Sequence, residues 1–295
     1  MIFLCYHGVT RYKSKGIENF SRKHINVKDF YDQMNIIKKK CNILDINSIY
    51  HHLSHNISFK KNSVAVSFDD GFENNFSQAL PILKKLKIPA IFYICPENIE
   101  KKTLFWVDKI EASIINTKKK SISLNSIKKT YSLRDENEKK RAIIKIKNLC
   151  KNSSVYKKDN IISELIKKTK TKISVKLSDN YKIAKWSQII SASKNNLFEI
   201  GGHSLEHNIF TKLPQKELKN EIFKCKDLIQ KKIGKKVKHF SYPEGKYNSN
   251  TIKILKELNI LTCPIASGQK NTKKTDVYKI KRIMVGFNNK KFPKF

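Results

Sequence analysis

The 295-residue chain is long enough for one large domain or two ordinary ones, and its 39% hydrophobic and 10% aromatic residues exclude global disorder. Its formal net charge of +36 is of the size found in nucleic-acid-binding proteins. Nearly all the basic residues are lysine, however, whereas arginine matches phosphates and base edges better. The charge therefore argues against a nucleic-acid partner and leaves open contact with an anionic membrane or a phosphorylated substrate.

Strands and helices alternate over residues 1–100. The apolar runs predict strands at 2–6, 64–68 and 88–94, and helices at 27–40 and 73–86. Pro81 is expected to start or kink the second of these helices. A strand–helix–strand unit of this kind places its two strands parallel in one sheet.

Residues 101–180 differ in character, with lysine runs, Ser/Asn loops and amphipathic patches. Their pattern predicts helices at 105–116, 135–151 and 160–170, and a hairpin within 121–133. We interpret this region as a mainly helical subdomain inserted into the fold.

Regular alternation resumes after residue 180. The patterns predict strands at 197–202, 237–242, 260–266 and 278–285, and helices at 186–193, 214–233 and 250–258. Seven or eight parallel strands separated by helices indicate an α/β fold. The prediction is a distorted (β/α) barrel of the TIM type, closed or nearly closed, built from residues 1–100 and 181–295.

The six cysteines are scattered and form no CxxC pair, which favours reduced thiols over a disulfide framework. Residues 1–7 lack the basic and apolar regions of a signal peptide, and no apolar run reaches the roughly 20 residues of a membrane span. We therefore expect a cytoplasmic protein, which leaves open an association with the inner face of the membrane.

Two short motifs carry the candidate chemistry. The run VAVSFDDG at residues 64–71 places Asp69 and Asp70 directly after a buried strand, where they form either a turn or a reactive site. The run HSLEH at 203–207 places two imidazoles near one another; with a carboxylate they form a three-ligand divalent-metal site, and alone they would suit a solvated turn. In a parallel barrel the carboxyl ends of all strands meet at one face, so the two motifs can converge there.

These motifs resemble those of the polysaccharide deacetylases (carbohydrate esterase family 4, with the NodB homology domain). SFDDG at 67–71 resembles the family's paired-aspartate element, HSLEH at 203–207 its metal element, and FSYPEGKY at 240–247 a third element. The N-terminal YHGV at 6–9 resembles the start of the circularly permuted branch. The resemblance covers residues 1–100 and 180–290.

The resemblance implies a distorted β/α barrel that hydrolyses the N-acetyl group of an amino sugar. Asp70, His203 and His207 would hold a divalent metal, with Zn²⁺ the expected ion, and Asp69 would be the general base. A backbone N–H near Tyr242 would help to hold the oxyanion. No histidine follows His239, so the resemblance assigns protonation of the leaving amine to His7.

The sequence departs from the family pattern in the third element. Ser241 stands where many members have an arginine that orients the base, and we predict that Arg282 pairs with Asp69 instead. Glu244 stands where an aromatic residue is usual. Substrate-binding residues carried over or suggested by the sequence are Tyr242, Pro243, Gly245 and Trp186, the last being either a sugar platform or a core residue.

The expected partner is an N-acetylated sugar or glycan, with a nucleotide- or lipid-linked precursor of a surface polysaccharide as the favoured form. Two alternatives remain open: a metal-dependent C–N hydrolase acting on a non-sugar amide, and a non-catalytic basic binding protein on the same fold. A further cluster, His51, His52 and His55, has no carboxylate partner nearby in sequence and is expected to be a solvated helix or loop.

Overall fold

The computed structural model describes residues 1–12, 14, 16–171, 178–286 and 292–295. The fold is built on a parallel sheet. The short strand β4 (Asn42–Ile43) pairs with the start of the central strand β5 and stands outside the main strand order. The other strands follow the order β10 (Ile265–Ala266), β11 (Lys281–Met284), β1 (Ile2–Tyr6), β5 (Ser63–Phe68), β6 (Ala90–Ile94) and β9 (Phe198–Gly202). The α/β class and the parallel pairing predicted from the sequence are confirmed.

The sheet curls toward a ring. Parallel bridges between Gly202 and Phe240 and between His239 and Thr262 continue the pairing from β9 to the segment that leads into β10. The strands predicted at 237–242 and 260–266 are therefore in the expected place, but only isolated bridges and the two-residue β10 form there. Pro264 interrupts this segment, because a proline has no N–H to donate to the ladder.

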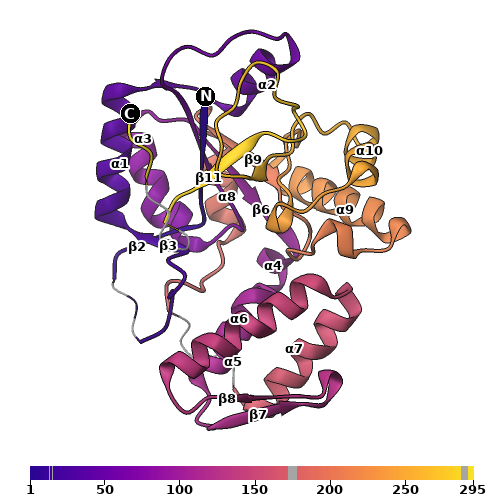
Figure 1. Cartoon of the computed structure of the whole chain (residues 1–295). Helices are drawn as coiled ribbons and strands as arrows, with labels where there is room; N and C mark the ends of the chain where they lie inside the picture. The colour runs from indigo at the N-terminus through magenta and orange to yellow at the C-terminus, as the bar shows by residue number, and fades with distance from the viewer. Residues whose placement is uncertain (13, 15, 172–177, 287–291) are drawn as a thin grey trace.

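Helices surround the sheet in the alternation that the sequence predicts (Figure 1). They are α1 (Val27–Lys40), α3 (Leu80–Leu86), α8 (Trp186–Ser193), α9 (Gln215–Ile233) and α10 (Ser249–Glu257). Asn26 caps α1 by accepting a hydrogen bond from the Lys28 N–H, and Gly234 ends α9 with a φ of 68°. Two short helices that the sequence did not predict are α2 (Ile46–Ser54) and α4 (Pro96–Lys101).

The helix predicted over 73–86 is divided in two. Asn75–Ala79 forms a π-helical turn, and α3 follows from Leu80. Pro81 explains the change, because its ring excludes the usual hydrogen bond to the preceding turn of an α-helix.

The inserted region contains the predicted helices and hairpin. These are α5 (Trp106–Asn116), β7 (Ser121–Leu124), β8 (Lys129–Ser132), α6 (Glu136–Asn152) and α7 (Val155–Thr169). They pack around their own apolar cluster, which includes Ile110, Ile143 and Leu165, and Figure 1 shows them gathered beneath the sheet. Helix α7 begins at Val155 rather than near residue 160, because Ser154 caps it by accepting from the Lys157 N–H.

The centre of the sheet is packed with aromatic rings. Phe68 on β5 stacks on Phe92 of β6 at 4.9 Å between ring centroids, and Tyr6 of β1 stacks on the other side of Phe68 at 5.5 Å. All six cysteines are free thiols, as predicted. In the described part of the chain, no helix combines the length and the apolar character needed to cross a bilayer.

His239 yields a prediction about stability. It is fully buried between Thr262 and Asn47, and desolvation lowers its pKa to about 3. Between pH 6.5 and about 3 the unfolded chain binds a proton at this position and the folded chain does not. The free energy of unfolding should therefore fall as pH falls through this window, by up to about 1.4 kcal/mol per pH unit for each such histidine.

Urea unfolding of the wild type and of His239→Gln across pH 4 to 7 measures this effect. The variant should show a smaller loss of stability per pH unit. His55→Gln, at the exposed C-terminal end of α2, is the control. Equal slopes for the wild type and His239→Gln would contradict the assignment.

Candidate active site

The polar residues singled out in the sequence meet at the carboxyl-terminal edge of the sheet. His7 follows β1, Asp69 and Asp70 follow β5, and His203 and His207 follow β9. Arg282 reaches the same place from within β11. All of them line one cavity of about 440 Å³. The convergence predicted from the parallel strands is therefore present.

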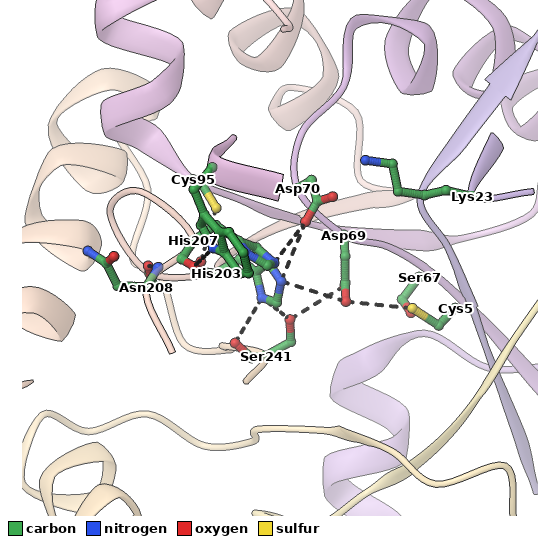
Figure 2. A network of polar contacts seen from close by, with 12 residues as sticks. Cys5, Lys23, Ser67, Asp69, Asp70, Cys95, His203, His207, Asn208 and Ser241 are labelled. Atoms are coloured by element: carbon green, nitrogen blue, oxygen red, sulfur yellow. Dashed lines mark hydrogen bonds and ion pairs between the residues drawn. The ribbon is translucent and has the colours of Figure 1, made fainter. Parts of the chain in front are cut away.

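Asp70, His203 and His207 form a compact trio. The Nε2 atoms of His203 and His207 lie 3.6 Å and 3.5 Å from Asp70 Oδ1, and Figure 2 shows both rings turned toward this carboxylate. Two ligands bonded to zinc at about 2.0–2.1 Å in a tetrahedral arrangement lie roughly 3.3 Å apart. The spacing of these three atoms therefore fits a divalent metal ion.

The electrostatics of the trio point the same way. Desolvation raises the pKa of Asp70 well above its usual range and lowers those of His203 and His207. Asp70 Oδ1 is buried and has no hydrogen-bond partner among the described residues. A buried carboxylate oxygen facing two neutral imidazoles is costly in a bare protein, and a bound cation offsets that cost.

Contacts of its Nδ1 atom with Ser241 fix the orientation of the His203 ring. Its Nδ1 lies 3.0 Å from the carbonyl oxygen of Ser241 and 2.6 Å from the hydroxyl of the same residue. Because a carbonyl oxygen only accepts, Nδ1 carries the proton and Nε2 presents its lone pair toward Asp70. Ser241 thus supports a metal ligand, although the family pattern would place an arginine there.

The two histidines come together through a loop rather than through a helical turn. Ser204 and His207 have positive φ values of 69° and 60°, and Asp70 has a φ of 77°. Such values are uncommon for residues other than glycine and concentrate at functional sites. Glu221 of α9 holds the loop by accepting from the Ser204 hydroxyl and the Leu205 N–H. The ring centroids of His203 and His207 consequently lie 5.0 Å apart.

A glycine is required where the loop leaves β9. A Cβ atom on Gly201 would lie 2.7 Å from the His239 carbonyl oxygen and 2.6 Å from the Tyr93 ring. No side chain fits there without displacing the backbone of the adjoining segment.

Asp69 is held by Arg282, as predicted. The guanidinium donates to both carboxylate oxygens, at 2.6 Å to Oδ1 and 2.7 Å to Oδ2. Burial raises the pKa of Asp69, but the charge and hydrogen bonds of Arg282, together with the nearby His203 and His7, outweigh burial and hold the pKa well below its usual range. The carboxylate therefore remains ionised at neutral pH and can accept a proton.

Further groups complete the surroundings of Asp69. The Ser241 hydroxyl donates to Oδ1 at 3.4 Å, and the Cys5 thiol lies 3.6 Å from Oδ2. Arg282 also donates to the Ser67 hydroxyl at 3.2 Å. His7 lines the same cavity, and desolvation lowers its pKa to about 3, so its ring is neutral.

The substrate-binding residues expected from the sequence are not all at the cavity. Tyr242 and Gly245 line the cavity, whereas Pro243 and Trp186 do not. The Trp186 indole N–H donates to Glu100 at 2.7 Å, and the Lys232 ammonium lies over the ring at 5.5 Å.

Trp186 therefore does not meet the expectation of a sugar platform. It is the first residue of α8, and this position directs its ring toward α4 and α9 instead of toward the cavity. The Tyr242 N–H, implied as an oxyanion donor, donates to the Pro264 carbonyl over 3.4 Å. The histidines at positions 51, 52 and 55 lie on and just after α2, away from the cavity.

Several cavity residues were not predicted. Lys23 is buried, pairs with Asp108 of α5 at 2.6 Å, and lies over the Phe72 ring. Helix α6 contributes Ile144, Lys147, Asn148 and Lys151. These four residues are separated by three, one and three positions, which places them on one face of a helix. The sequence therefore contained a pattern from which this shared face could have been predicted. The pairing of Lys23 with a residue 85 positions away left no such signal.

The sequence profile described as polysaccharide deacetylase matches residues 56–262, which is more than half of the chain. The chain belongs to the polysaccharide deacetylase family. Members of this family are hydrolases acting on carbon–nitrogen bonds, and this deacetylase is therefore an enzyme of that class. None of the curated proteins matches its sequence.

Solved structures of deacetylases share the fold of this deacetylase. The Streptococcus pyogenes deacetylase PplD, in complex with acetate, superposes with a TM-score of 0.65 at 16% identity, covering 98% of this chain and 93% of that one. IcaB from Ammonifex degensii gives a TM-score of 0.62 at 16% identity, covering 96% and 91%. A de-N-acetylase from Aggregatibacter actinomycetemcomitans gives 0.57 at 17% identity, covering 99% and 96%.

Proposed function

We propose that this deacetylase is metal-dependent and removes the N-acetyl group from an amino sugar in a glycan or glycan precursor. The observation that carries the proposal is the single cavity in which a metal-fitting trio lies beside an ionised, arginine-held carboxylate. The trio is Asp70, His203 and His207, and the carboxylate is Asp69. Zn²⁺ is the expected ion, because two neutral imidazoles and a carboxylate are ligands that it prefers.

When bound at the trio, the metal would polarise the acetyl carbonyl and lower the pKa of a water molecule. The residues of the chain would supply the proton transfers. Asp69 would accept the proton of the attacking water, and Arg282 would keep Asp69 ionised and fixed in direction. The Ser241 hydroxyl and the Cys5 thiol adjoin the same carboxylate and limit its rotation.

Cleavage of the C–N bond leaves an amine that needs a proton. His7 is the proposed donor because it lines the cavity next to these groups. Since its pKa is about 3, His7 is neutral before the reaction. The proton that it donates must therefore come from the attacking water, by way of Asp69. One proton leaves the water and one reaches the amine, so the transfer balances.

The expected substrate is an N-acetylated sugar on a nucleotide or lipid carrier, with the reaction in the cytoplasm or at the inner membrane face. The six free thiols support a reducing compartment. The net charge of +36 would favour approach to phosphates or to an anionic membrane surface. A non-sugar amide remains the alternative substrate, for which the same cavity chemistry would serve.

Release of acetate tests the proposal. The purified protein, loaded with Zn²⁺, is incubated with free, oligomeric, UDP-linked and lipid-linked N-acetyl sugars and with simple non-sugar acetamides, and acetate is measured. We expect release from the sugars, and a loss of about 10²–10⁴-fold in Asp69→Asn with zinc still bound. Release from the acetamides alone would support the alternative, and no release from any substrate by the zinc-loaded protein would contradict both.

A further inference from the structure

Helix α6 of the inserted region forms one wall of the catalytic cavity. Ile144, Lys147, Asn148 and Lys151 all line it, and their spacing places them on one face of the helix. The Ile144 side chain is 46% exposed although it is a large apolar group. An apolar side chain left open toward a catalytic cavity suits contact with the apolar face of a sugar ring.

The wall is tied to the barrel by a bond across the cavity. Lys151 Nζ lies 2.7 Å from Glu244 Oε2, and both residues line the cavity. Glu244 belongs to the tight turn that follows Tyr242 and has a positive φ of 56°. This ion pair therefore joins α6 to the turn that borders the metal-fitting trio. It is half-buried, since the two side chains are 32% and 23% exposed.

Other contacts hold the insertion in the same position. Lys158 of α7 donates to Asn208 at 2.7 Å, and the Trp106 indole N–H donates to the His207 carbonyl at 3.0 Å. Lys23 pairs with Asp108 of α5. These contacts hold α5 and α7 beside the cavity, and α6 packs against both of these helices.

The charges of the cavity lysines are matched by carboxylates. Lys23 pairs with Asp108, Lys147 with Glu111, and Lys151 with Glu244. Each of these lysines already has an anionic partner, so the inner cavity suits a neutral sugar better than a phosphate. A volume of about 440 Å³ accommodates roughly one or two sugar residues.

We propose that α6 restricts this deacetylase to an N-acetylated sugar at a chain end or on a small carrier, and that the Lys151–Glu244 pair is the barrier. An internal residue of a polymer needs an open groove on both sides, and the pair closes one side. The charged carrier of a precursor would then lie outside the cavity. This inference rests on the proposed function and names the substrate class of the same site.

The position of deacetylation within an oligosaccharide tests the inference. Zinc-loaded wild type, Lys151→Met and Glu244→Gln are incubated with β-linked N-acetylglucosamine oligomers of one to six residues, and mass spectrometry locates each free amine. We expect the wild type to deacetylate terminal residues in large excess over internal ones. In both variants the ratio of internal to terminal deacetylation should rise by at least about fivefold, as expected for loss of one partly screened ion pair.

Lys145→Met is the matched control, since it removes the same charge from an exposed position of α6 outside the cavity. Its ratio should equal that of the wild type. Internal deacetylation by the wild type as fast as terminal deacetylation, or an unchanged ratio in both cavity variants, would overturn the inference while leaving the proposed function intact. Acetate release from none of the N-acetyl sugars, including the carrier-linked ones, would overturn the proposed function itself.

Discussion

Replacing Arg282 by methionine should lower kcat by about 10²–10⁴-fold while zinc content stays near that of the wild type. Burial raises the pKa of Asp69, and the guanidinium of Arg282 makes the largest contribution that lowers it. Without Arg282 the pKa of Asp69 should rise, and the carboxylate would lose the two hydrogen bonds that fix its direction, so proton transfer from the attacking water would be impaired. Metal content should persist because the carboxylate of the metal-fitting trio is Asp70. Acetate-release kinetics and metal analysis on the same preparation measure the two effects.

The same substitution should also reduce stability. Removing one partner of a buried ion pair leaves an uncompensated charge and costs about 3–5 kcal/mol. The double variant Asp69→Asn with Arg282→Met removes both charges, so it should regain stability but not activity. Arg141→Met, at an exposed position of α6, is the matched control and should behave as wild type. An Arg282→Met enzyme with wild-type kcat would exclude the orienting role.

Replacing Asp70 by asparagine should weaken zinc binding by more than about 100-fold. Loss of a group that only supports a metal ligand already costs up to about 100-fold, and Asp70 would be a ligand itself. The substitution should also raise the melting temperature of the metal-free protein. Asp70 is a buried carboxylate with a raised pKa and an oxygen that has no hydrogen-bond partner in the described chain, so a neutral side chain relieves a cost. Titration with zinc, followed by calorimetry of the free and loaded forms, measures both changes.

Asp108→Asn is the control for Asp70→Asn. Asp108 is also a buried carboxylate near the cavity, but its partner is Lys23. This control should lose stability and keep its affinity for zinc. Equal zinc-induced shifts in the melting temperature of the wild type and Asp70→Asn would show that the ion binds elsewhere.

The parallel strands and the edge that carries the site could be predicted, because each apolar run is followed directly by polar residues. Continuous apolar runs such as 64–68 are typical of strands buried on both faces, and the polar residues that follow mark the edge where they meet. This rule brings the two motifs together, and the resemblance to the deacetylases assigned Asp70, His203 and His207 to the metal. The pairing of Arg282 with Asp69 could also be predicted, because the resemblance implies an arginine that orients the base and Arg282 is the lone arginine of the C-terminal half.

The remaining features depend on tertiary contacts that local patterns do not encode. Helix α2 and the six-residue α4 are short, and their apolar spacing is too brief to separate them from loops. Trp186 was left open as a sugar platform or a core residue; it packs against the core, and contacts with α4 and α9 set the direction of its ring. The Lys151–Glu244 and Lys23–Asp108 pairs join segments far apart in the chain, and lysines are too numerous here for any one to stand out.

The central claim is that a metal ion held by Asp70, His203 and His207 is required for de-N-acetylation. Its most direct test is the rate of acetate release from an N-acetyl sugar by one preparation as isolated, after chelation, and after zinc is restored. We predict that the rate is lost on chelation and returns in proportion to the zinc bound, up to one ion per chain. A rate that chelation leaves unchanged while the bound metal is removed would contradict the claim.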